Sequence, residues 1–241
     1  MPGIHEGSGL CEGRDEGRGG LESLGTYEAS VYSQCGEDGV LQRIFEVIGA
    51  HNRRFVEFGA WDGQHLSNTA NLRLQHGWTG LLMEGSDRAD GVLVQQEFVN
   101  AENVNRLFAK YAVPPVFDLL SIDIDGNDYW VWKAIEDYTP RVVVMEYNIF
   151  FGLHHACTIR YDADHVWDET LYHGASLLAL RNLGREKGYS LVHTDSWAPN
   201  AFFVLESALP AGYEEPPIEH VTPWNAFDEM PPVEGREWVR L

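Results

Sequence analysis

The chain has 241 residues, with 17 basic against 37 acidic side chains and a formal charge of −20. This length is sufficient for one domain with a sizeable core, and the negative charge argues against a nucleic-acid binder, which needs a basic footprint, and against an anionic membrane surface as partner. No stretch approaches the ~20 apolar residues of a membrane span, the first twenty residues lack the apolar core of a signal peptide, and three cysteines without a C-x-x-C spacing favour a reduced, cytoplasmic enzyme.

The predicted elements alternate between helix and strand along most of the chain. Residues 1–29 are rich in Gly, Glu and Arg without an apolar period, so we expect a disordered arm there. From Asp38 the apolar residues follow helical spacing, and a short buried strand over 54–59 then runs into glycines. The further predicted elements are a helix over 65–76, strands over 79–84 and 91–99, a helix over 104–111, a strand over 116–124, a helix over 131–138, a strand over 141–147, a helix over 175–187, and strands over 189–193 and 201–205.

Strands that are apolar throughout and alternate with helices indicate a mainly parallel sheet covered on both faces. We therefore predict an α/β fold with a doubly wound, seven-stranded sheet in which one edge strand is reversed. The predicted domain covers residues 30–205, and its segment 148–173 is long enough to be a lid or an acceptor-binding insertion. Residues 206–241 are rich in proline and acidic residues, and we expect an irregular tail.

The first strand leads into EFGAWDG (57–63), at the edge of the sheet where doubly wound folds bind their ligands. Gly59 would allow a tight turn, and Gly63 a close approach of the backbone to a ligand. Glu84 ends the next strand, 21 residues past Gly63, where a carboxylate can accept both hydroxyls of a ribose. The alternative is that the glycines merely turn the chain and that Glu84 is an exposed strand-end acid.

Two residues of this run favour S-adenosylmethionine over NAD. The pyrophosphate fingerprint G-x-G-x-x-G is absent, because Trp61 stands at the position of its second glycine. Glu57, which precedes the glycines, would repel an anion and attract the amino and sulfonium groups of S-adenosylmethionine.

Seven segments together resemble the FkbM-related class I S-adenosylmethionine-dependent methyltransferases. They are SQCGEDGVLQRIF (33–45), VEFGAWDGQHLSNT (56–69), GLLMEG (80–85), ENVN (102–105), LLSIDIDGNDYWVW (119–132), RVVVMEYN (141–148) and NAFFV (200–204). The resemblance runs over about 30–205, and SIDIDGNDYW together with MEYN is its most specific part. It implies a seven-stranded fold of the Rossmann-like class I type and a small acceptor, with sugar-hydroxyl methylation the best-known activity of such enzymes.

The resemblance also implies that the stretch ahead of the first helix closes over the cofactor. The predicted cofactor-binding residues are Gln34, Glu37, Glu57, Gly59, Ala60, Trp61, Gly63, Ser67, Asn68, Glu84, Gly85 and Asp123. The arm, the tail and residues 149–173 depart from the family, so the identity of the acceptor does not transfer.

Acidic side chains follow two neighbouring strands of the predicted sheet. Asp123 and Asp125 end one strand, and Glu146 and Asn148 end the next, so these oxygens would converge as ligands for Mg²⁺. Such an ion would fix the acceptor hydroxyl and lower its pKa, which makes Asp123 and Asp125 predicted catalytic residues. The alternative is that Asp123 contacts the amino group of the cofactor, that Glu146 braces a loop and that no metal is needed. Asp128 is better explained as the N-cap of the helix that follows.

The segment 148–173 supplies the remaining candidates. His154, His155, His165 or His173 would titrate near neutral pH as a general base, although a lone histidine is more often structural; we assign His154 and His155 as catalytic candidates. Its aromatic side chains would form an apolar acceptor pocket or simply pack the lid; they are Phe150, Phe151, Tyr161, Trp167 and Tyr172. The predicted substrate-binding residues are Tyr147, Asn148, Phe150, His154, Trp167 and His173.

The predicted function is a Mg²⁺-assisted O-methyltransferase of a small hydroxylated metabolite of sugar or natural-product type. A metal-independent N- or carboxylate-methyltransferase and a catalytically silent nucleotide-binding scaffold are the alternatives. The expected partner is a small acceptor molecule, with no nucleic acid and no membrane, and assembly into a homo-oligomer stays open.

Overall fold

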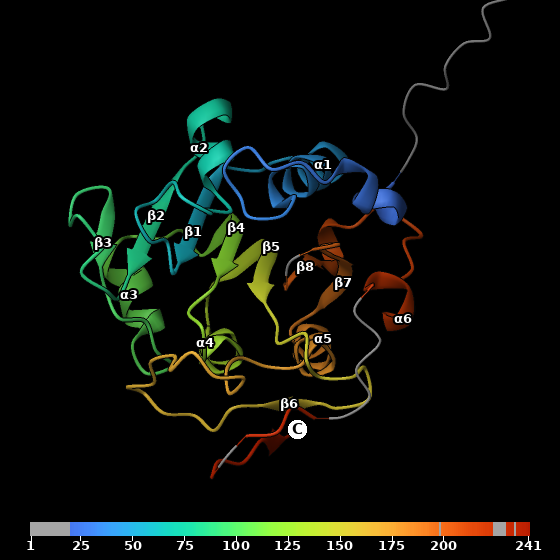
Figure 1. Cartoon of the computed structure of the whole chain (residues 1–241). Helices are drawn as coiled ribbons and strands as arrows, with labels where there is room; N and C mark the ends of the chain where they lie inside the picture. The colour runs from blue at the N-terminus through green and yellow to red at the C-terminus, as the bar shows by residue number, and fades with distance from the viewer. Residues whose placement is uncertain (1–19, 198, 224–229, 234) are drawn as a thin grey trace, which may run out of the picture.

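A seven-stranded sheet with the order β3-β2-β1-β4-β5-β8-β7 forms the centre of the protein (Figure 1). The structure, a computed structural model, describes residues 20–197, 199–223, 230–233 and 235–241. The strands of the main sheet are β1 (Arg54–Phe58), β2 (Thr79–Glu84), β3 (Val94–Gln96), β4 (Val116–Ile122), β5 (Thr139–Glu146), β7 (Tyr189–Thr194) and β8 (Asn200–Leu205). A separate pair joins β6 (Cys157–Thr158) to β9 (Val239–Arg240).

The helices cover both faces of this sheet. They are the 3₁₀ helices η1 (Leu21–Tyr27) and η2 (Glu206–Ala208) and the α-helices α1 (Glu37–Ile48), α2 (Ala70–His76), α3 (Val104–Lys110), α4 (Asp128–Ala134), α5 (Leu177–Glu186) and α6 (Ile218–Val221). Figure 1 shows α1 and α2 on one side of the sheet and α3, α4 and α5 on the other. Within the described residues, no helix has both the length and the apolar character that crossing a membrane requires.

Alternation along the strands sends neighbouring side chains into two cores. On β4, Leu119 packs with η1, α1 and α2, whereas Leu120 packs with α3, α4 and α5. Successive side chains of a strand point to opposite faces, so a strand buried on both faces is apolar at nearly every position. The predicted α/β class with a mainly parallel, doubly wound sheet is confirmed.

The predicted place of the reversed strand is wrong. The strands β1 to β5 pair in parallel, but β8 lies between β5 and β7 and is antiparallel to both, so β7 forms the edge. On β8, Phe202 faces one core and Phe203 the other, and both are fully buried. The edge strand carries the half-buried His193 and a register irregularity between Leu191 and His193, which an edge position tolerates better.

Two predicted helices differ from the structure at their ends. The helix expected over 65–76 begins only at Ala70, because the loop before it is held in a non-helical conformation by hydrogen bonds to Glu57. The helix expected to reach Tyr138 ends at Ala134, and Ile135 already has an extended backbone.

Part of the predicted arm belongs to the folded domain. Residues 1–19 lie outside the described residues, but η1 follows directly, and its Leu21 and Leu24 are each 2% exposed. Both side chains pack in the core formed with α1 and α2. Two leucines three positions apart are too short a pattern to reveal a helix in the sequence, so the boundary at residue 29 is wrong.

The predicted irregular tail also contributes to the core. Ile218 and Val221 of α6 are buried and pack in the core formed with α3, α4 and α5. Thr222 lies 3.1 Å from the hydroxyl of Tyr147, oxygen to oxygen, and β9 pairs with β6. The described part of 206–241 is therefore irregular in secondary structure, but Ile218, Val221 and Thr222 anchor it to the domain.

We predict that Leu24→Ala destabilises the protein by about 2–4 kcal/mol, because it removes a buried leucine and leaves a cavity. The free energy of unfolding from urea titration measures this loss. The matched control is Leu74→Ala on α2, where the side chain is 44% exposed and the same change should alter stability by less than about 0.5 kcal/mol. Equal stability of the two variants would show that η1 does not pack on the domain.

Candidate functional site at the carboxyl edge of the sheet

The glycines after β1 are required by the packing of the protein itself. Gly59 has φ +70°, and a Cβ at this position would lie 1.6 Å from the carbonyl oxygen of Asp123. Gly63 has φ +77°, and its Cβ would meet the side chains of Leu82 and Val94 at 3.0 Å. Gly63 therefore faces core side chains, where the sequence led us to expect a close approach to a ligand.

Glu57 holds the loop that follows these glycines. Its carboxylate is 3% exposed and accepts hydrogen bonds from the hydroxyls of Ser67 and Thr69 and from the backbone N–H of Asn68. Burial raises the pKa of Glu57. Glu57 and Ser67, which we predicted to bind a cofactor, do not line the cavity described next. Their side chains instead form hydrogen bonds within the domain. Asn68 alone of this group reaches the cavity described next.

A cavity of about 820 Å³ opens where the strand order reverses between β1 and β4, the position at which doubly wound sheets bind ligands. The predicted site residues that line it are Gln34, Glu37, Gly59, Trp61, Asn68, Glu84, Gly85, Asp123, Asp125, Glu146 and Trp167. Lining residues that the sequence did not single out include Arg88, Glu97, Phe98, Asn127, Val166 and Asn200. Ala60 and Gly63, also predicted, do not line it. A second hollow of about 410 Å³, beside Gly49 and Arg141, has no carboxylate in its described lining.

The loop ahead of α1 forms one wall of this cavity. Asp38 accepts the backbone N–H groups of Tyr32 and Ser33, and its own N–H donates to the hydroxyl of Ser33 at 3.1 Å. Glu37 accepts the N–H of Cys35 at 2.7 Å and the side-chain amide of Asn200 at 2.8 Å. These bonds carry Gln34 and Glu37 to the cavity.

Glu84 joins the loops that follow β1 and β2. Its carboxylate accepts the backbone N–H of Trp61 at 3.1 Å and of Ser86 at 2.8 Å. The guanidinium carbon of Arg88 lies 4.2 Å from the centroid of the Trp61 ring. Each carboxylate oxygen can accept more than one hydrogen bond, so Glu84 retains acceptor capacity toward the cavity.

Three carboxyl groups meet at the ends of β4 and β5. Asp123, Asp125 and Glu146 each offer an oxygen within 4.8 Å of the others, which confirms the predicted convergence of these three. Desolvation and the neighbouring carboxylates raise the pKa of Asp123 and of Glu146 well above the usual range, and raise that of Asp125 to about 6. Oε2 of Glu146 is buried without a hydrogen-bond partner among the described residues and lies 3.9 Å from Nδ1 of His173. A cation between the three groups would relieve their repulsion.

Asn148 is a brace and not a fourth member of this group. Its amide donates to the carbonyl oxygens of Leu171 at 2.9 Å and of His173 at 3.1 Å, and its oxygen accepts the N–H of Phe150 at 3.0 Å. The side chain is buried and ties the two ends of the segment 148–173 together. The prediction that Asn148 contributes to a metal site is therefore wrong.

Asp128 also differs from its prediction. The N-cap of α4 is Asn127, and Asp128 is the first helical residue. Its two carboxylate oxygens accept the backbone N–H groups of Ile124 at 2.9 Å and of Gly126 at 2.8 Å. Asp128 thus fixes the turn on which Asp125 sits with a positive φ of 54°.

The segment 148–173 contributes three lining residues, His165, Val166 and Trp167. Asn127 donates to the carbonyl oxygen of Asp162 at 2.7 Å, which holds this part of the segment over the end of β4. A Cβ at Gly126 would lie 2.2 Å from the ring of His165, so glycine makes room for this histidine.

Tyr147, just ahead of this segment, and most of the segment's other candidates lie outside the cavity lining. Those of the segment are Phe150, Phe151, His154, His155, Tyr161, Tyr172 and His173. Tyr147 is buried against Thr222, and the ring of Phe151 packs on Trp238, 4.6 Å between centroids. His165 is accordingly the histidine of this segment that reaches the cavity. Local sequence held no signal for this choice among four histidines, because it depends on the path of the loop.

No model of a known protein family matches the chain, and no curated protein matches it in sequence. Solved structures that resemble it include the CurJ carbon methyltransferase, at 9% identity and a TM-score of 0.43 over 72% of this chain and 56% of that one. An O-methyltransferase family protein from Burkholderia thailandensis has 10% identity and a TM-score of 0.36 over 70% and 57%. An S-adenosylmethionine-dependent methyltransferase from Clostridium acetobutylicum ATCC 824 has the same identity and TM-score over 70% and 90%. The chain thus spans little more than half the length of the first two.

We predict that Asp128→Asn destabilises the protein by about 1–3 kcal/mol, because an amide has one acceptor oxygen and its NH₂ group would face a buried N–H donor. Urea denaturation measures the change. Asp90→Asn is the matched control, since Oδ1 of Asp90 alone accepts the N–H groups of Val92, Leu93 and Val94 and asparagine retains that oxygen. An unchanged midpoint for Asp128→Asn would contradict the bracing role.

Proposed function

We propose that the chain is an S-adenosylmethionine-dependent methyltransferase that methylates a hydroxyl group of a small metabolite with the help of Mg²⁺. One observation carries the proposal. A single cavity at the switch point of the sheet holds both Glu84, at the end of β2, and the cluster of Asp123, Asp125 and Glu146. Asp123, Asp125 and Asn127 of SIDIDGNDYW and Glu146 of MEYN line the same cavity, and these two stretches are the ones that most specifically resemble FkbM-type enzymes.

The charge of the lining supports a cationic cofactor. The carboxylates of the cavity are Glu37, Glu84, Glu97, Asp123, Asp125 and Glu146, against the single guanidinium of Arg88 in the described lining. An acidic, partly enclosed site attracts cations and repels the pyrophosphate of a dinucleotide. S-adenosylmethionine supplies, when bound, a methyl group activated by a positively charged sulfur.

The described residues offer a place for each part of that cofactor. Glu84 has acceptor capacity for the ribose hydroxyls, as strand-end acids have in related sheets. Gln34 and Glu37 line the wall formed by the loop ahead of α1, and Glu37 is a partner for an amino group. Trp61 offers an apolar ring surface at the same cavity.

The three-carboxylate cluster fits a hard divalent cation. Its ligand atoms are all oxygen, the set that Mg²⁺ prefers, and Oε2 of Glu146 has no hydrogen-bond partner among the described residues. The chemistry that such an ion supplies is a lowered pKa for a coordinated hydroxyl. Asp123, Asp125 and Glu146 would hold it and thereby orient an acceptor toward the methyl donor.

His165 is the residue that we propose takes the proton of the acceptor hydroxyl. Its Nε2 atom is buried, has no hydrogen-bond partner among the described residues, and belongs to a side chain that lines the cavity. Val166 and Trp167, from the same segment, supply apolar surface beside it, which excludes water from part of the site.

We predict that S-adenosylhomocysteine binds to the wild-type chain and that Glu84→Ala weakens this binding by about 1.5–3 kcal/mol, the range for a lost hydrogen bond to a charged group. Isothermal titration calorimetry measures both affinities. Asp87→Ala is the control, because Asp87 is an exposed carboxylate of the same loop outside the cavity lining. Equal affinities of a folded Glu84→Ala variant and the wild type would remove the ribose assignment, and no binding to the wild type would remove the cofactor.

We further predict a Mn²⁺ site for which Mg²⁺ competes, and that Asp125→Asn and Glu146→Gln each weaken it at least about tenfold. Electron paramagnetic resonance of free Mn²⁺ measures the affinity without a turnover assay. The control is Asp164→Asn, which changes an exposed carboxylate of the segment 148–173 outside the cavity lining. Unchanged Mn²⁺ affinity in both cluster variants would exclude a metal site at this cluster. His165 would then be the base of a metal-independent enzyme.

A further inference from the structure

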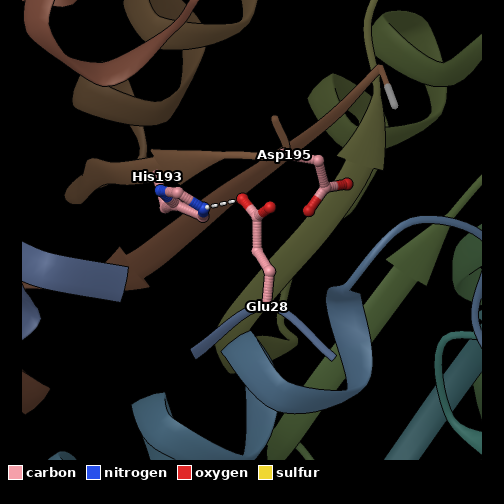
Figure 2. A group of neighbouring side chains, drawn as sticks. All are labelled: Glu28, His193 and Asp195. Atoms are coloured by element: carbon pink, nitrogen blue, oxygen red, sulfur yellow. Dashed lines mark hydrogen bonds and ion pairs between the residues drawn. The ribbon is translucent and has the colours of Figure 1, made fainter. Parts of the chain in front are cut away.

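A second cluster of potential metal ligands lies where the segment after η1 meets the end of β7. Glu28 follows η1, His193 is in β7, and Asp195 follows the last residue of that strand. Each offers one ligand atom within 4.8 Å of the other two. Figure 2 shows the carboxylate of Glu28 between the imidazole of His193 and the carboxylate of Asp195. The cluster shares no residue with the three carboxylates proposed to hold Mg²⁺.

Asp195 is the observation that points to a ligand. Its residue is 0% exposed, and neither carboxylate oxygen has a hydrogen-bond partner among the described residues. A buried carboxyl group without partners costs free energy that hydrogen bonds normally offset. Burial, followed by the charge of Glu37, raises the pKa of Asp195 to about 10. Glu37 and Asn200 lie close enough to shift this pKa, but neither makes a hydrogen bond of acceptable geometry to the carboxyl group of Asp195, and a cation would supply the missing partner.

The surrounding chain fixes the positions of the other two members, Glu28 and His193. Oε1 of Glu28 accepts hydrogen bonds at 3.0 Å from Nε2 of His193 and from both the N–H and the hydroxyl of Ser196. Gly36 has φ +127°, and a Cβ there would lie 2.7 Å from Cβ of Glu28. The glycine therefore leaves the space in which Glu28 approaches the strand end.

We propose that Glu28, His193 and Asp195 bind a divalent transition-metal ion, with Zn²⁺ the best match. One imidazole nitrogen and two carboxylate oxygens form a set that zinc accepts readily, whereas Mg²⁺ and Ca²⁺ prefer oxygen ligands alone. Binding uses the lone pair of Nε2 of His193, so the ring proton lies on Nδ1 in the occupied state. Three protein ligands leave a fourth position for water.

The ion would fasten the chain ahead of α1 to the hairpin of β7 and β8. Glu37, in the first turn of α1, is bonded to Asn200 at the start of β8, and both line the large cavity. Fixing Glu28 to the same hairpin would stiffen this wall. The role proposed for this ion is to hold the wall in place, and that role does not depend on the proposed methyl transfer.

The test uses the full chain, stripped with a chelator and kept in excess Mg²⁺ so that the all-oxygen site is filled. Calorimetry with Zn²⁺ should give one site in the wild type, and Asp195→Asn and His193→Gln should each weaken it at least about tenfold. His220→Gln, the same change at an exposed histidine, and Asp125→Asn, in the other cluster, should leave it unchanged. Saturating Zn²⁺ should raise the melting temperature of the wild type and not that of the two site variants.

Either of two calorimetric results would overturn the proposal: no Zn²⁺ bound by the wild type up to about 0.1 mM, or equal Zn²⁺ affinity in the wild type and both site variants. Circular dichroism checks that the variants fold. If Asp195→Asn does not, His193→Gln decides, since His193 is half-buried and its replacement removes the bond to Glu28 and the ring contact with Phe202. With Co²⁺ as probe, the visible absorption bands of a nitrogen-ligated ion should appear in the wild type and change in His193→Gln. Identical Co²⁺ spectra of the two proteins would also contradict the assignment.

Discussion

Repulsion among carboxyl groups at the carboxyl edge of the sheet is the constraint on which the site depends. Parallel strands have their carboxyl ends at the same edge of the sheet, and β2, β4 and β5 bring Glu84, Asp123 and Glu146 to that edge. Asp125 follows Asp123 by two residues in the turn after β4. Two unit charges about 4 Å apart interact by about 4 kcal/mol at an effective dielectric constant of 20. This repulsion is reduced either when these carboxyl groups stay protonated or when the site binds a cation. A cationic cofactor and a divalent ion are ligands that relieve it while leaving the carboxylates ionised.

Hydrogen bonds divide the buried carboxylates of this chain into two kinds. Asp118 accepts the backbone N–H groups of three successive residues, 51–53, and pairs with Arg141. Glu57 is satisfied within the domain in the same way and fixes the loop after β1. Among the described residues, Oε2 of Glu146 and both oxygens of Asp195 are buried without a hydrogen-bond partner, whereas Asp38 leaves only Oδ1 unpaired and accepts three backbone N–H groups with Oδ2. Carboxylates that accept several backbone or hydroxyl hydrogen bonds build the scaffold, and Glu146 and Asp195 belong to the two clusters for which we propose a cation.

The sequence predicts what depends on local pattern. Apolar runs located the seven strands of the sheet, and the placing of Asp123 and Glu146 at neighbouring strand ends predicted that they meet. Such a pattern does not record the direction in which a side chain points at a strand end. For this reason the sequence did not reveal that Glu57 faces the interior and that Asn148 binds a loop. Leu24 in η1 and the pair of Glu28 with His193, 165 positions apart, depend on long-range packing that no local period records.

The most direct test of the central claim is a crystal structure of the full chain with S-adenosylhomocysteine and Mn²⁺, in which anomalous scattering locates the metal. The account predicts the adenosine beside Glu84 and an anomalous peak between Asp123, Asp125 and Glu146. Those are the positions at which the acidic cavity offers acceptor capacity and a buried, unpartnered oxygen. A cavity that holds neither nucleoside nor ion at saturating concentrations of both would contradict it.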